Sequence, residues 1–368
     1  VVTNPPYMGS DSMNERLKDY ISDNYSNVRY DIYAVFITKC LSMKRDNGFC
    51  AMITQNSFLF ALCFERLRNI IVKTASIVNA VHLGPRAFEE ISGEVVQTIA
   101  SIFTNYVNHR RARFIRLVEY SDQKEEFFLK VKPFDVDCNY FSELPNSVFA
   151  YSLSEQMKQL CLHERKVGDI FISKAGVVTG KDEYFLRYWY EPNFCEFDQH
   201  ATGITSKYVP FSKGGSFVKW YGNIGYAMKL ADLWNDAKVN KSVRRGDRSA
   251  YFQKCIGWSY MGGGNEKRFS QLSNCVCGTG TPTILAPDDS AYYYVLGFLN
   301  TKIPRKFIEQ FNPTLNTYAS DICNLPFVDI SDRSLVVSIS TGCVEIARAD
   351  WDSFETSWDF QIHPLLQY

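Results

Sequence analysis

The first 119 residues alternate short apolar runs with helical patterns. Continuous apolar runs of strand length occupy residues 49–54, 76–83 and 95–103, as is typical of strands buried on both faces of a sheet. Between them, residues 30–41 and 57–72 repeat apolar side chains at helical spacing. Alternating strands and helices predict an α/β fold. We expect the strand over 95–103 to be the antiparallel edge of its sheet.

The pattern changes along the rest of the chain and predicts four parts. Residues 1–119 hold the α/β pattern, in which the polar stretch 10–25 predicts a short helix or lid. Residues 120–165 are mixed and contain prolines, as in a connector. A second domain is expected over 166–328. The apolar, acidic tail over 329–368 carries two tryptophans at heptad spacing, and we expect it to pack back as a helix onto the first domain.

Composition describes a soluble globular protein without a membrane segment. The 368 residues are 46% hydrophobic and 22% charged, enough for more than one domain. No apolar run reaches the ~20 residues that span a bilayer, and the start shows no signal-peptide pattern, which predicts a cytoplasmic protein. The eleven cysteines include no CxxC pair. Reduced, buried thiols are therefore expected, with no metal site.

The net charge is zero, but the charges are unevenly distributed. Residues 201–270 contain twelve lysines and arginines against four acidic residues. Residues 319–360 contain eight acidic residues against two basic ones. The basic segment is a candidate footprint for phosphates, although a merely solvated basic face remains an alternative.

The most specific local pattern stands at the start of the chain. Two valines finish a predicted strand, and Asn4, Pro5, Pro6 and Tyr7 follow in a turn. Consecutive prolines lack amide hydrogens and cannot continue into a helix, so preceding carbonyls are not used by helical hydrogen bonds. Such a rigid loop suits a fixed hydrogen-bond acceptor site. An ordinary Pro-Pro turn after a strand is the alternative.

Asn4-Pro5-Pro6-Tyr7 resembles the motif of DNA methyltransferases that methylate exocyclic amino groups. The amino group of adenine is a poor nucleophile because its lone pair is delocalised into the ring. In that family the Asn oxygen and the next carbonyl accept hydrogen bonds from the amino group, and the aromatic ring stacks on the flipped base. The resemblance therefore implies that Asn4 and Pro5 are the acceptors within a catalytic loop of Asn4, Pro5, Pro6 and Tyr7.

Longer stretches resemble one branch of that family. They are similar to the PglX-type adenine methyltransferases of BREX phage-defence systems, and they lie near both ends of the chain, at residues 4–10, 82–90, 93–98 and 351–360. The similarity is therefore expected to cover the whole chain. For Arg86 and Glu94, a salt-bridged turn and a substrate contact remain equally open.

The resemblance also implies S-adenosylmethionine as the methyl donor. Family members hold this cofactor with a glycine-bearing turn and an acidic residue, both upstream of the catalytic motif. No such elements precede Asn4. We therefore expect the C-terminal half of a Rossmann-like methyltransferase sheet, within the C-terminal fragment of a longer enzyme. The fragment alone should be inactive and should not bind S-adenosylmethionine tightly.

The second domain resembles the target-recognition domains of type I specificity subunits. The similar stretches begin at 166–182 and close at 296–302, 312–315 and 322–326, which implies a mixed α+β fold. Loops over 213–222 and 258–265 combine glycines with aromatics, and the first also carries lysines; such loops suit a DNA groove or, alternatively, a structural hairpin. The candidate DNA-binding residues are Lys181, Lys213, Lys219, Trp220, Tyr221, Arg244 and Arg245.

Taken together, the sequence predicts a fragment of a site-specific DNA adenine-N6 methyltransferase that marks self DNA in phage defence and restriction-modification. Its expected partners are double-stranded DNA and other BREX proteins. A non-catalytic DNA-binding module is one alternative. The same chemistry aimed at RNA or at protein glutamine is another, because the motif suits any planar amino group.

Overall fold

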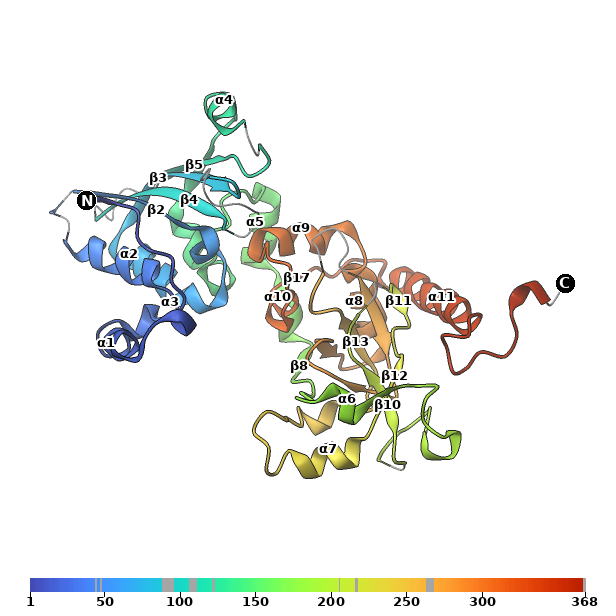
Figure 1. Cartoon of the computed structure of the whole chain (residues 1–368). Coiled ribbons are helices and arrows are strands. Elements are labelled where there is room, and N and C mark those ends of the chain that lie inside the picture. The colour runs from blue at the N-terminus through green and yellow to red at the C-terminus, as the bar shows by residue number, and fades with distance from the viewer. Residues whose placement is uncertain are drawn as a thin grey trace. The chain divides into compact units, whose positions relative to one another are not determined.

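A computed structural model describes most of the chain. The described residues are 1–43, 45–46, 48–87, 96–105, 111–120, 123–204, 206–215, 218–262 and 268–366. They form two compact units, Val1–Leu162 and His163–Tyr368, and each unit is described by itself (Figure 1). Glu94 and the end of the predicted 258–265 loop lie outside the described residues.

The first unit is built on a six-stranded sheet in the order β1-β2-β4-β3-β5-β6. Its strands β1, β2, β3 and β5 run parallel, whereas β4 and β6 are antiparallel to their neighbours. The carboxyl ends of the parallel strands therefore meet at one edge, where α/β proteins place their ligands. The strands are β1 (Val2–Thr3), β2 (Phe49–Gln55), β3 (Ser76–Gly84), β4 (Thr98–Thr104), β5 (Arg111–Arg116) and β6 (Phe134–Asp137).

The expectation that the strand over 95–103 would be an edge is wrong. β4 is antiparallel, as predicted, but it lies between β2 and β3 and pairs with both. Ile99 and Phe103 are completely buried. An interior strand needs no polar residues to protect an open edge, which accounts for the continuous apolar run.

The helices expected in the first unit are present. They are α1 (Glu15–Tyr25), α2 (Ile32–Met43) and α3 (Glu65–Thr74), and Figure 1 shows α2 and α3 beside the sheet. Tyr33, Ala34 and Ile37 of α2 are completely buried, as its apolar pattern predicts. α3 begins later than expected because Asn56–Leu59 and Leu62–Phe64 form 3-10 turns.

The stretch predicted as a connector, 120–165, packs on the first unit as far as residue 162. It contains α4 (Lys124–Phe128), β6 and α5 (Glu155–His163). The Tyr151 ring stacks on Phe114 of β5 with 4.4 Å between centroids and 2° between planes. This segment therefore contributes to the core of the unit as well as leading out of it.

A buried arginine ties the same segment to α3. The Arg68 side chain is completely buried and donates hydrogen bonds to the carbonyls of Phe58 (3.0 Å), Ala61 (2.7 Å) and Asn146 (2.9 and 3.1 Å). Burial lowers the pKa of Arg68 to about 10. The partner Asn146 has a φ of 53°, in the left-handed region. Arg68 thus stabilises an otherwise unfavourable turn.

The described residues of the second unit have a mixed α/β architecture with three small sheets. The orders are β15-β10-β12-β9, β11-β14-β13-β16-β8 and β17-β7. The strands are β7 (Arg165–Lys166), β8 (Ile172–Lys174), β9 (Leu186–Tyr188), β10 (Val209–Ser212), β11 (Trp220–Tyr221), β12 (Tyr226–Met228), β13 (Cys255–Trp258), β14 (Phe269–Leu272), β15 (Val276–Cys277), β16 (Thr283–Leu285) and β17 (Pro326–Phe327). The helices are α6 (Asp182–Phe185), α7 (Leu230–Asp236), α8 (Asp289–Leu299), α9 (Lys302–Phe311), α10 (Ala319–Cys323) and α11 (Arg333–Asp352).

The tail forms a helix over Arg333–Asp352, as predicted, and within the second unit α11 packs on α8 and β11. Two glycines allow this close approach, since a Cβ on Gly297 would collide with Ser340 and one on Gly222 would collide with Trp351. Because α11 ends at Asp352, Trp358 lies beyond it and packs on Trp189 and Phe197. Among the described helices, none has an apolar stretch long enough to cross a membrane.

Candidate functional site

The Asn-Pro-Pro-Tyr loop leaves β1 at the edge where the parallel strands end. β1 is anchored to β2, because the Val1 backbone nitrogen donates to the Phe49 carbonyl (2.9 Å) and the Ala51 amide donates to the Val1 carbonyl (2.8 Å). Pro5 is buried, whereas Asn4 is exposed. The loop is therefore fixed before Asn4 by β1 and after it by the buried Pro5, whereas solvent and ligands can reach the Asn4 side chain.

Asp31, at the start of α2, holds the other end of this loop. Its Oδ1 accepts hydrogen bonds from the backbone amides of Met8 and Tyr33, each at 3.1 Å. The Ile32 amide donates in turn to the Met8 carbonyl at 3.1 Å. Burial raises the pKa of Asp31, although these backbone bonds oppose the shift. Asp31 was not among the residues predicted from the sequence, although an Asp directly before an apolar helix is a helix-capping signal.

Tyr7 is partly buried and presents its hydroxyl to the interior. Its ring packs edge-on against Tyr33, with 6.2 Å between centroids and 83° between planes. The hydroxyl is buried and has no hydrogen-bond partner among the described residues. Burial, and secondarily the Asp31 carboxylate, raises the pKa of Tyr7 to about 12. The phenol therefore stays neutral, and its ring is the part that remains for a ligand.

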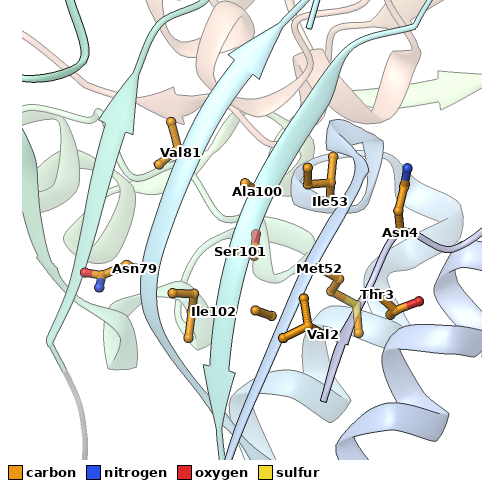
Figure 2. Close-up of a pocket in the computed structure, with 11 residues that line it drawn as sticks. Val2, Thr3, Asn4, Met52, Ile53, Asn79, Val81, Ala100, Ser101 and Ile102 are labelled. Carbon is orange, nitrogen blue, oxygen red and sulfur yellow. The ribbon is translucent and has the colours of Figure 1, made fainter. Parts of the chain in front are cut away.

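A cavity of about 430 Å³ lies on the sheet beside Asn4. Figure 2 shows its lining side chains on β1, β2, β4 and β3, with Asn4 beyond the end of β1. Apolar side chains dominate, and the polar ones belong to Thr3, Asn4, Asn79 and Ser101. The lining includes neither a carboxylate nor a glycine. It therefore does not fit the ribose and methionine parts of S-adenosylmethionine, which need such groups.

A buried polar network lies at the same carboxyl edge. The Asn56 amide nitrogen donates to His82 Nε2 (2.8 Å) and to Gln97 Oε1 (3.1 Å). His82 Nδ1 then carries the hydrogen and bonds the Tyr151 hydroxyl at 2.7 Å. Burial, together with the nearby Arg116, lowers the pKa of His82 to about 3. The network thus joins the ends of β2, β3 and β4 through a neutral histidine.

Three of the predicted DNA-binding cations lie around one segment of the second unit, residues 178–182. Lys181 belongs to it, and Lys213 forms an ion pair with Asp182 at 2.9 Å. Arg244 is bridged to it because its amide donates to the Val178 carbonyl at 2.9 Å. Lys181, Lys213 and Arg244 are all exposed.

The other predicted residues make contacts within the unit. The Lys219 ammonium lies 5.0 Å from the Trp220 ring centroid. Arg348 of α11 lies 5.4 Å from the Tyr221 centroid. The Arg245 guanidinium lies 4.8 Å from the Trp234 ring centroid and donates to the Trp234 carbonyl at 2.9 Å.

Pairing also reduces the basic surface that the sequence predicted. Lys207 forms an ion pair with Glu196, and Lys254 forms one with Asp289. Both acidic partners lie outside residues 201–270, so the charge count of that segment did not include them. In the described ranges, no cluster of three or more His, Cys, Asp or Glu side chains could hold a metal ion.

Comparison with known proteins confirms the resemblance to PglX-type methyltransferases. Residues 1–88 match the family described as Eco57I restriction-modification methylase. The chain is 30% identical over 388 residues to adenine-specific methyltransferase PglX of Lacticaseibacillus casei (strain Zhang), covering 99% of this chain and 32% of that protein. It is 30% identical over 381 residues to adenine-specific methyltransferase BrxX of Escherichia coli O9:H4 (strain HS), covering 100% and 30%. The chain thus spans about a third of the length of these relatives.

Solved structures share the fold at low identity. The Type IIL restriction-modification enzyme MmeI in complex with DNA matches 98% of this chain and 50% of its own, with a TM-score of 0.59 and 12% identity. A nuclease-deletion mutant of the Type ISP enzyme LlaGI, in complex with a DNA substrate mimic, matches 94% and 41%, with a TM-score of 0.57 and 14% identity. The fold of this chain is therefore found in restriction-modification enzymes.

Proposed function

We propose that this chain supplies the base-accepting loop and the target-recognition part of an adenine-specific DNA methyltransferase that marks DNA in phage defence. The observation that carries the proposal is the Asn-Pro-Pro-Tyr loop at the carboxyl edge of the sheet, with Asn4 exposed beside the cavity. The names of the two 30% identical relatives support adenine as the target.

The loop would act on the exocyclic amino group of a flipped adenine. The Asn4 side-chain oxygen and the Pro5 carbonyl would accept hydrogen bonds from its two N–H groups, which raises the electron density on the nitrogen that receives the methyl group. The Tyr7 ring stacks on the base. Asp31 positions this loop through the Met8 amide. S-adenosylmethionine would supply the methyl group, and we assign none of the cavity-lining residues to it.

The second unit would select the DNA sequence. Support comes from the exposed Lys181 and Arg244 around 178–182, where Lys213 is paired with Asp182, and from the shared fold of DNA-bound restriction-modification enzymes. Double-stranded DNA is accordingly the proposed partner, with other BREX proteins as further partners in the cytoplasm. Lysines and arginines of this kind position a protein on phosphates, whereas base contacts specify sequence.

The test compares two asparagines that line the same cavity. In the protein as encoded, Asn4→Ala should reduce the rate of methyl transfer from labelled S-adenosylmethionine to duplex DNA by about 100-fold or more, as for loss of one fixed donor or acceptor at a reacting group. Asn79→Ala, on β3, should change it by less than about threefold. DNA binding should be retained in both variants.

Two results would overturn the proposal. Full DNA methylation by the Asn4→Ala variant would remove the catalytic role of the loop. Methylation of RNA or of protein glutamine, with no modified adenine in DNA, would change the substrate class. Sequencing modified adenines in genomic DNA, with and without the gene, gives the second readout.

A further inference from the structure

Three tyrosines form an exposed stack on the four-stranded sheet of the second unit. The Tyr190 ring stacks on Tyr188 with 5.5 Å between centroids and 1° between planes. Tyr188 stacks on Tyr226 at 5.1 Å and 24°. The Lys213 ammonium lies 5.4 Å from the Tyr226 centroid. We call Tyr190, Tyr188 and Tyr226 the tyrosine ladder.

The ladder continues the core of the unit out to its surface. In the pairing of β9 with β12, Leu186 lies opposite Met228, and Tyr188 lies opposite Tyr226. Leu186 and Met228 belong to a buried apolar cluster, against which Tyr226 packs. Along the same face, exposure then rises to 48% for Tyr188 and 66% for Tyr190. Burial therefore cannot account for the two outer tyrosines.

Backbone and side-chain bonds hold the outer tyrosines in place. The Tyr188 amide donates to Glu191 Oε2 (2.6 Å), and the Glu191 amide donates to the Tyr188 carbonyl (3.0 Å). This turn places Tyr190 over Tyr188. The intervening Trp189 is held by Trp358 and by a hydrogen bond to the Thr356 carbonyl at 3.1 Å. The ladder is thus ordered before any ligand binds, which lowers the entropy cost of binding.

The free groups of the ladder define the ligand that it can bind. The ring faces of Tyr188 are used within the stack, and the Tyr188 and Tyr226 hydroxyls hydrogen-bond each other. This leaves the outer face of Tyr190, the Tyr190 hydroxyl, and the one hydroxyl hydrogen that the Tyr188–Tyr226 pair does not use. A ligand must therefore bring oxygen acceptors to the hydroxyls, and a flat or apolar group to Tyr190. Nucleotides have both, and tyrosine hydroxyls are among the groups that contact DNA phosphates.

We propose that the tyrosine ladder is a binding site for the sugar-phosphate backbone of the target DNA. This inference rests on the proposed function. Asp182 already pairs with Lys213 at 2.9 Å, so the contact depends mainly on neutral hydroxyls and rings. The ladder accordingly adds affinity with little dependence on salt, in contrast to contacts made by unpaired cations.

The test measures binding of a labelled duplex to the whole chain by fluorescence anisotropy. Tyr188→Ala and Tyr190→Ala should each weaken binding by about tenfold, and the phenylalanine variants by about threefold to tenfold, because one hydrogen bond is lost. The slope of log affinity against log salt should not change, because no charge is removed. Tyr20→Ala, a 56% exposed tyrosine of α1, is the matched control and should bind as wild type does.

The outcomes separate this inference from the proposed function. If the wild type binds DNA and the folded ladder variants bind it equally well, the ladder proposal is wrong and the proposed function stands. If the wild type binds no duplex but binds RNA of equal length, both are overturned. Ethylation interference gives a second measurement, since some of the ethylated phosphates that block the wild type, those at the ladder, should not block the double alanine variant.

Discussion

The unsatisfied hydroxyl of Tyr7 allows a substitution that separates base stacking from folding. Tyr7→Phe removes one oxygen that is buried without a hydrogen-bond partner among the described residues. The ring, its edge-on contact with Tyr33 at 6.2 Å and the loop geometry set by Asp31 all remain. Tyr7→Ala removes the ring as well.

The magnitude follows from the cost of burying a polar group without a partner. That cost is about 1–3 kcal/mol for a neutral group. Tyr7 is only partly buried, so we take the lower end and expect Tyr7→Phe to raise the free energy of unfolding by about 1 kcal/mol. For a unit of this size the midpoint of thermal unfolding should rise by about 2–4 °C.

Methylation activity should depend on the Tyr7 ring and hardly on its hydroxyl. If the ring stacks on the flipped base, Tyr7→Phe should methylate DNA within about twofold of the wild type. Tyr7→Ala should lose about 1–3 kcal/mol of base stacking, or roughly fivefold to 150-fold in kcat/KM. The assays are thermal denaturation followed by circular dichroism and methyl transfer to duplex DNA by the protein as encoded.

Two results would contradict this reasoning. A lower midpoint of thermal unfolding for Tyr7→Phe would mean that the Tyr7 hydroxyl makes a stabilising hydrogen bond and is not unsatisfied. A large activity loss in Tyr7→Phe that equals the loss in Tyr7→Ala would assign the role to the hydroxyl instead of the ring.

Two further predictions concern the framework around the loop. Arg68→Met should lower the free energy of unfolding by about 3 kcal/mol in a denaturant titration, because one buried and two part-buried carbonyls lose their donor. Arg66→Met, exposed on the same helix, should change it by less than about 0.5 kcal/mol. Similar values for both variants would refute the stabilising role of the Arg68 hydrogen bonds. The pKa of His82 lies near 3 in the fold and near 6.5 in unfolded chains, so below pH 6.5 the unfolded state binds more protons and stability falls as pH falls. We expect the free energy of unfolding to be about 2 kcal/mol lower at pH 5 than at neutral pH because of His82. The His82→Gln variant should lack this decrease. If its free energy of unfolding falls with pH as steeply as that of the wild type, His82 is not the source of the pH dependence.

Much of the first unit follows from local patterns in the sequence. Buried strands and helices have distinct apolar periods, so β2, β3 and α2 are predictable from their own residues. The loop of Asn4 to Tyr7 is equally predictable from the sequence, because prolines constrain the backbone locally. The order of the strands in the sheet cannot be predicted in this way, since a strand at the edge and a strand between two neighbours can have the same apolar sequence pattern. The interior place of β4 depends on pairing partners far away in sequence.

The second unit shows the same limit for charges and aromatic residues. A count of basic residues predicted a phosphate-binding surface, but it could not reveal that Asp182 pairs with Lys213, 31 positions later in the chain. Nor could it bring Tyr226 beside Tyr188, a contact that exists only because β9 pairs with β12. Sequence by itself determined which local elements form and which chemistry we propose for the opening loop, because both depend on neighbouring residues. The tertiary structure decided which charges remain unpaired and which rings stack, because those properties arise from contacts between distant segments.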